Sequence, residues 1–316
     1  MSAAPAPPPP PKPLSHLTKR DLAVLQATAK LRFITAKDLA YLLGSPTSLT
    51  AIRHLVASLA GGTEHVEGHY LYHLVPPTTT RGNSERVYCL GSKGAEAITQ
   101  LLGEPVYWYC LPSKLKGFSY SFLRHALLLT RVVTALTSCA RTHPAYTVTD
   151  TRLCYELVRG SVPGLSEATA PALPLPVIPD AWVHLCVDGR SAPLWIEADC
   201  GTEMRHKFQA GLKARIAFLQ SGYEEVFATP AVTILYLTTG HIEAYKDNRR
   251  EAMQRWTQAL LRELELQEWA ESFRFASVTY DSLYTAPLFD APVFYGPGEP
   301  NPVALLAPPN TEGDTP

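Results

Sequence analysis

The sequence predicts an α+β protein: a helix-turn-helix with a β-hairpin at the N-terminal end, then a larger α/β domain with a mixed central sheet. Two observations lead to this prediction. Between residues 18 and 61, apolar residues recur at helical spacing in three short segments, and two extended stretches follow them. Between residues 181 and 280, strand-like apolar runs alternate with amphipathic helical segments.

Composition narrows the class of protein. A chain of 316 residues with 46% hydrophobic and 18% charged residues can bury one large core or two ordinary ones. No run approaches the roughly 20 apolar residues of a membrane-spanning helix, and the N-terminus is rich in proline where a signal peptide would be apolar. Six cysteines lie far apart without a CxxC pair, which indicates reduced thiols. We therefore expect a cytoplasmic protein with no membrane partner.

Charge is distributed unequally along the chain. Residues 1–160 hold 17 lysines and arginines against 9 acidic residues, whereas residues 161–316 hold 11 against 20. The first half therefore carries a net charge of +8 and the second −9. A positive half suits nucleic acid, because each Lys or Arg near a phosphate releases condensed counterions, and an acidic half would repel it. Chance asymmetry on solvated faces is the alternative explanation.

Three helices are expected near the N-terminus. The first covers residues 18–31 and begins with a capping-box pattern. The second starts after Thr35 and ends at Gly44, and the third starts after Pro46 and ends at Gly61. Tight turns between them predict a helix-turn-helix arrangement.

A β-hairpin is expected next, from the extended stretches 64–75 and 85–90, and a fourth helix covers residues 92–102. Helix-turn-helix followed by a hairpin is the order of a winged helix, whose third helix enters the major groove. We therefore favour double-stranded DNA as the partner; the alternative is a helical module that contacts protein. The residues expected to reach bases or phosphates are Thr47, Ser48, Thr50, Arg53, His54, His69, Arg81, Arg86 and Lys93.

The remainder of the chain alternates between helical and extended patterns. An apolar helix at residues 118–138 carries His125, and such a lone histidine is more often a core residue than a ligand. A Pro/Ser/Gly/Ala-rich loop, residues 160–176, is too long for an ordinary connection and is expected to be mobile or functional. The other expected segments are strands at 146–158, 181–187, 194–199, 231–237 and 273–280 and helices at 203–220 and 247–270.

Acidic residues gather at the ends of two predicted strands. Asp180 opens one strand, and Glu197 and Asp199, two residues apart, share one face of the next. Adjacent strands would bring these carboxylates together as a hard-oxygen site for Mg²⁺ or Mn²⁺. Lys207, in the first turns of the following helix, could approach that site. A solvated acidic turn is the alternative interpretation.

These motifs resemble two known groups. Pro179-Asp180, the Glu197-x-Asp199 strand and the following helix resemble the core of the PD-(D/E)XK nuclease-like superfamily. A closer resemblance, over roughly residues 17–239, is to the replication-relaxation family, whose proteins are associated with plasmid replication and mobilisation. The resemblance rests on the order of the predicted features along the chain. These are the winged helix, Tyr88-x-Leu90-Gly91-x-x-Gly94, the His125 helix, Pro179-Asp180-Ala181 and Glu197-Ala198-Asp199-Cys200-Gly201-Thr202-Glu203.

Composition, the order of the predicted elements and the resemblance together imply a domain organisation. A disordered proline-rich tail at residues 1–16 would precede a winged-helix DNA-binding domain at 17–105. A restriction-endonuclease-like domain would occupy residues 106–285, and a second proline-rich tail residues 286–316.

The nuclease resemblance also implies roles for individual residues. Asp180 and Glu197 would hold the metal ion that polarises a phosphodiester and activates water. Asp199 stands where the superfamily usually has lysine, so the cationic role would fall to Lys207 or Lys213, or be absent.

Two functions therefore remain open. The first is a DNA-binding protein of plasmid or mobile-element replication or mobilisation, and a candidate metal-dependent endodeoxyribonuclease that cleaves or nicks DNA. The second is a non-enzymatic replication initiator or transcriptional regulator, whose inactive nuclease-like domain serves dimer or partner binding. Either one predicts double-stranded DNA, a second copy of the chain and replication or mobilisation proteins as partners.

Overall fold

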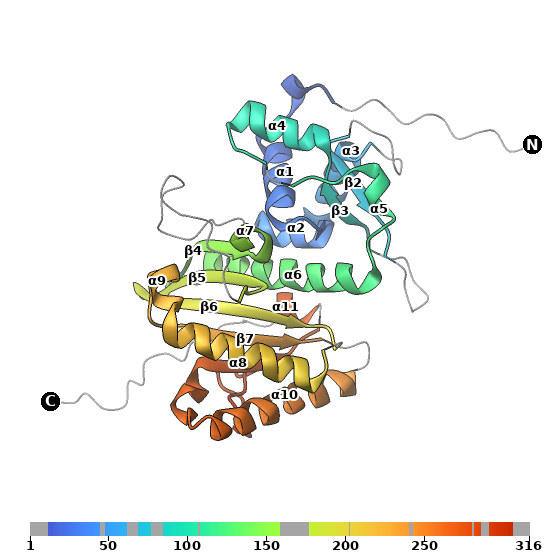
Figure 1. Ribbon diagram of the computed structural model, residues 1–316. Helices are drawn as coiled ribbons and strands as arrows, with labels where there is room; N and C mark the ends of the chain where they lie inside the picture. The colour runs from blue at the N-terminus through green and yellow to red at the C-terminus, as the bar shows by residue number, and fades with distance from the viewer. Residues whose placement is uncertain are drawn as a thin grey trace, which may run out of the picture. The chain divides into compact units, whose positions relative to one another are not determined.

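The computed structural model divides the chain into two compact units, residues 1–130 and 131–316 (Figure 1). The sequence had placed the boundary between residues 105 and 106. The residues that the structure describes are 12–44, 48–61, 69–76, 85–106, 108–158, 177–201, 203–239, 243–279, 281–285 and 291–305. The loop predicted at residues 160–176 lies outside them, as do residues 1–11 and 306–316 of the predicted tails.

Helices dominate the first unit. Two of them begin with capping boxes, in which Thr18 pairs with Asp21 and Thr35 with Asp38. In chain order the elements are η1 (Leu14–His16), α1 (Lys19–Leu31), β1 (Ile34–Thr35), α2 (Ala36–Leu42), α3 (Leu49–Leu59), β2 (Leu71–Leu74), β3 (Val87–Leu90), α4 (Ser92–Leu102), α5 (Pro112–Leu115) and the start of α6 (Tyr120–Thr142).

The predicted hairpin is present as β2 and β3. Leu71 pairs with Leu90 in antiparallel register, and β1 joins the other edge of β3 with Ile34 opposite Tyr88. The resulting sheet has the order β1-β3-β2. Residues 62–68 and 77–84, which the sequence assigned to the hairpin and its turn, lie outside the described residues.

The motif Gly91-x-x-Gly94 marks a close approach between α4 and the chain leading into β2. A Cβ atom on Gly91 would lie 2.4 Å from the carbonyl oxygen of His69, and one on Gly94 would lie 2.3 Å from that of Tyr70. The Gly91 amide donates a hydrogen bond to the Tyr70 carbonyl at 2.9 Å. Glycine is required at both positions because no side chain fits between the two backbones.

The second unit is built around a five-stranded mixed sheet of order β4-β5-β6-β7-β8. β4, β5 and β6 are antiparallel to one another in turn, and β7 and β8 continue parallel to β6. The predicted α+β class and mixed central sheet are confirmed. After α6, the elements are β4 (Tyr146–Leu153), α7 (Cys154–Val158), β5 (Ala181–Val187), β6 (Arg190–Asp199), α8 (Arg205–Ser221), α9 (Tyr223–Phe227), β7 (Thr233–Thr238), α10 (Glu243–Glu263), η3 (Gln267–Ser272), β8 (Phe273–Ser277) and α11 (Ser282–Thr285).

Several boundaries in this unit were predicted wrongly, and β6 and α10 each begin four residues earlier than expected. The stretch 146–158 is extended only as far as Leu153, because the Glu156 side chain accepts the Leu153 amide at 2.8 Å and starts α7. The helix predicted for 247–270 ends at Glu263, because Glu265 adopts a left-handed φ of 58° and breaks the helix before η3.

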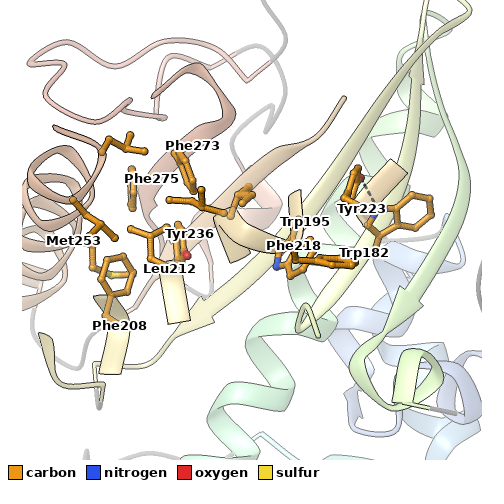
Figure 2. Close-up of a cluster of buried hydrophobic side chains, with 14 of the residues drawn as sticks. Trp182, Trp195, Phe208, Leu212, Phe218, Tyr223, Tyr236, Met253, Phe273 and Phe275 are labelled. Atoms are coloured by element: carbon orange, nitrogen blue, oxygen red, sulfur yellow. Dashed lines mark hydrogen bonds between the residues drawn. The ribbon is translucent and has the colours of Figure 1, made fainter. Parts of the chain in front are cut away.

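An aromatic core joins one face of the sheet to α8 and α10 (Figure 2). Trp182 on β5 lies opposite Trp195 on β6, and the Tyr236 and Phe275 rings stack with centroids 5.2 Å apart. Phe208 of α8 packs against the Tyr236 ring at 5.3 Å. Glu197 and Asp199 follow Trp195 at two-residue intervals along β6, so both carboxylates share its face of the sheet, the face that the core covers.

We predict that Gly94→Ala destabilises the protein. Alanine favours a helix over glycine, but its Cβ would meet the Tyr70 carbonyl oxygen at 2.3 Å, and such overpacking costs about 1–3 kcal/mol. Gly117→Ala is the matched control, since its nearest neighbour lies at 3.4 Å. Urea unfolding followed by circular dichroism measures both, and an equal midpoint for the two variants would contradict the close approach.

Candidate functional site

The face of α3 opposite its core residues is polar and exposed. Ile52 and Val56 are fully buried, which turns Thr50, Arg53 and His54 toward solvent. These three lie as the sequence predicted. Ser48, at the start of the same helix, is only partly exposed and accepts a hydrogen bond from Arg20 at 3.2 Å.

Arg53 and Arg86 meet near the Tyr88 hydroxyl. Burial raises the pKa of Tyr88, while the charge of Arg86, its hydrogen bond to Tyr88 and the charge of Arg53 oppose that rise. Arg86 is itself exposed, just before β3. The structure therefore places two predicted DNA contacts, one on the helix and one on the hairpin, near Tyr88, together with the acidic Glu85.

Other predicted contacts lie elsewhere. Lys93 follows β3, so the length of that strand separates it from Arg86, and its ammonium lies 5.0 Å from the centre of the Tyr70 ring. His69 was predicted wrongly as a DNA contact, because it is buried at 2% exposure beneath Gly61. Thr47 and Arg81 lie outside the described residues.

The second candidate site is the carboxylate cluster formed by Asp180, Glu197 and Asp199. The antiparallel pairing of Ala181 with Ile196 places Asp180 beside Glu197, as predicted from the strand order. The Asp180 carboxylate also accepts the Ala198 amide at 2.9 Å. Adjacent strand ends thus bring these two acids together.

Arg215 of α8 neutralises Glu197 through both carboxylate oxygens. Its Nε donates to Oε1 at 2.9 Å and its Nη2 to Oε2 at 2.6 Å, while the Trp195 indole donates to Oε1 at 2.6 Å. Burial raises the pKa of Glu197 to about 7, against the opposing charge of Arg215. Burial alone would lower the pKa of Arg215, but Tyr236 and Glu197 raise it, so the guanidinium stays charged.

Arg249 of α10 neutralises Asp199 in the same way. Its Nε donates to one carboxylate oxygen at 2.5 Å, and the other oxygen accepts the Gly201 amide at 2.6 Å. The Arg249 guanidinium also lies 5.2 Å from the centre of the Trp256 ring. Burial raises the pKa of Glu203 nearby. Two helices therefore each supply an arginine to a carboxylate of β6.

This arrangement does not fit a Mg²⁺ or Mn²⁺ ion. Such an ion is held by the negative charge of its carboxylates, whereas Arg215 already neutralises Glu197 and Arg249 already neutralises Asp199. Within the described part of the chain, no group of three or more His, Cys, Asp or Glu side chains is placed to hold a metal ion.

The cation beside the carboxylates is an arginine that the sequence analysis missed. Lys207 is exposed on α8, and Lys213 pairs with Glu263 at 3.0 Å. Arg215 follows Phe208 by seven residues and therefore falls on the buried stripe of the helix. In the sequence, an arginine on the apolar stripe of the helix that follows the acidic strand could have predicted this ion pair.

Comparison with known proteins places the chain in a family. Residues 25–229, more than half of the 316, match the family model for replication-relaxation. The chain belongs to the replication-relaxation family. The match covers α3, the carboxylate cluster and Arg215, and it ends before Arg249.

No curated protein and no solved structure matches this replication-relaxation protein. Across the residues that the structure describes, no helix has the length and apolar character to cross a bilayer.

We predict that Arg215→Met lowers the free energy of unfolding by about 3–5 kcal/mol, because Glu197 loses its counter-charge in a buried site. A Glu197→Gln/Arg215→Met double variant removes the stranded charge and should recover most of that loss. Lys213→Met is the control, since its ion pair is exposed and should change stability by about 1 kcal/mol or less. Urea unfolding at pH 8 compares the three variants. If Arg215→Met lowers the free energy of unfolding no more than Lys213→Met does, the Glu197–Arg215 ion pair is contradicted.

Proposed function

We propose that this replication-relaxation protein binds double-stranded DNA in the replication or mobilisation of a plasmid or other mobile element. Membership of the replication-relaxation family supports the role in replication or mobilisation. The exposed face of α3, with Thr50, Arg53 and His54, is the observation that carries the DNA-binding part of the proposal.

The first unit binds DNA as a winged helix in this proposal. Three helices precede the β2–β3 hairpin, and β1 completes a sheet of order β1-β3-β2. α3 enters the major groove, and Arg86 at the base of the hairpin contacts phosphate beside it. The net charge of +8 on residues 1–160 supports this assignment, because it strengthens attraction to the phosphate backbone.

The second unit acts without cutting DNA in this proposal. Arg215 and Arg249 hold Glu197 and Asp199 in ion pairs, so the carboxylates stabilise the packing of α8 and α10 on the sheet. The unit then serves as a platform for a second copy or for replication or mobilisation proteins. This is the non-enzymatic alternative that the sequence left open.

Metal-dependent cleavage is the second candidate. One observation favours it: Asp180 and Glu197 lie beside each other at adjacent strand ends, as the nuclease resemblance implies. Glu197 would have to separate from Arg215 before either of its oxygens could bind an ion.

We predict that Arg53→Ala weakens binding of the full chain to duplex DNA and lowers the slope of log K against log salt by about 1, because one phosphate or base contact is lost. Arg190→Ala is the matched control, since Arg190 is an exposed arginine at the start of β6. Fluorescence anisotropy with a labelled duplex at several salt concentrations measures both. The proposal is contradicted if both variants change duplex affinity equally, or if the wild-type slope of log K against log salt is near zero.

A further inference from the structure

A second surface of the first unit exposes large apolar side chains. Tyr109 is 46% exposed, Leu111 is 43% exposed and Phe122, in the first turns of α6, is 44% exposed. We call this region, with Trp108, Phe118, Tyr120, Lys114 and Lys116, the aromatic–basic surface. It is formed by the chain on either side of α5 and by the start of α6. Large apolar side chains exposed along one short stretch of chain mark interaction sites.

A buried ring holds the surface in place. Phe33 lies beneath it, with ring centroids 5.4 Å from Trp108, 5.0 Å from Phe118 and 5.6 Å from Phe122. Phe118 and Phe122 stack at 5.4 Å with an interplanar angle of 14°. The Phe122 ring is therefore fixed from below while much of it stays open to solvent.

The segment that forms the surface carries basic residues and no acidic ones. Between Glu104 and Asp150 the chain contains no Asp or Glu. Lys114 and Lys116 are exposed, and the Arg124 guanidinium lies 5.7 Å from the centre of the Tyr120 ring. Aromatic rings interleaved with cations complement a polyanion whose bases are open for stacking.

A strained residue adds a further cation. Arg32 ends α1 with a φ of 63°, in the left-handed region that costs a non-glycine residue free energy. The next residue is held in place, because the Thr130 hydroxyl donates to the Phe33 carbonyl at 2.8 Å. This conformation sets the Arg32 guanidinium 5.2 Å from the centre of the Trp108 ring.

We infer that the aromatic–basic surface binds single-stranded DNA. Exposed rings of Tyr109 and Phe122 stack on unpaired bases, and Lys114 and Lys116 contact the phosphates. Duplex DNA keeps its bases stacked inside, so it cannot use the rings in this way. The inference rests on the proposed function in that the partner is DNA, but it concerns residues other than those of α3.

The test measures binding of the full chain to a labelled oligothymidine and to a labelled duplex by fluorescence anisotropy. Tyr109→Ala/Phe122→Ala should lose about tenfold or more in affinity for oligothymidine, because stacking on each ring contributes roughly 1–3 kcal/mol per base. Duplex affinity should stay unchanged. Leu101→Ala is the matched control, since Leu101 is 45% exposed on α4 of the same unit.

A second variant guards against loss of fold, because Phe122 packs on Phe33. Lys114→Glu/Lys116→Glu leaves the rings intact and should also weaken oligothymidine binding and flatten its salt dependence. The inference is overturned if the wild type does not bind oligothymidine. It is also overturned if both variants weaken binding to the duplex as much as binding to oligothymidine. It is also overturned if they change only the oligomeric state in size-exclusion chromatography.

The same experiment separates the two proposals. If Arg53→Ala leaves duplex binding unchanged while the aromatic variant loses oligothymidine binding, the assignment of α3 fails and the single-strand inference stands. If only Arg53→Ala has an effect, the assignment of α3 to duplex DNA stands and the single-strand inference fails.

Discussion

The ion pair between Glu197 and Arg215 joins the centre of the second unit's sheet to α8. Both side chains are largely buried among the aromatic residues of the core. A buried carboxylate without a partner would lower the stability of the fold by several kcal/mol. The Arg215 guanidinium must therefore stay beside Glu197 for that carboxylate to remain charged. Arg215 shares the helix stripe of Phe208 and Leu212, and the pair therefore sets the rotation of α8 on the sheet.

The same constraint decides what the carboxylate cluster can do. Asp180 and Glu197 lie beside each other at adjacent strand ends, but each carboxylate of β6 already accepts hydrogen bonds from an arginine and other donors. Arg215 lies inside the part of the chain shared with the replication-relaxation family, whereas Arg249 lies beyond it. The three carboxylates and Arg215 therefore fall within the family match, and Arg249 falls outside it.

Local patterns made most of the fold predictable. The capping boxes at Thr18 and Thr35 fix where two helices begin, and the helix predicted behind a Ser92 cap ends at Leu102, as α4 does, although Gly91 is its N-cap. The nearness of Asp180 and Glu197 followed from the adjacency of two strands. The arginines could not be placed, because Arg215 and Arg249 reach β6 from 18 and 50 residues away and depend on how two helices pack. The aromatic–basic surface likewise depends on Phe33, far earlier in the chain.

We propose that Arg215 and Arg249 hold the carboxylate cluster in a state that does not cleave DNA. The most direct measurement incubates the purified full chain with supercoiled DNA in Mg²⁺ or Mn²⁺, beside Asp180→Ala and Glu197→Ala at equal concentration. We predict that the wild type produces no more nicked or linear DNA than either variant. Cleavage by the wild type that both variants lose would contradict it and establish a metal-dependent nuclease at this site.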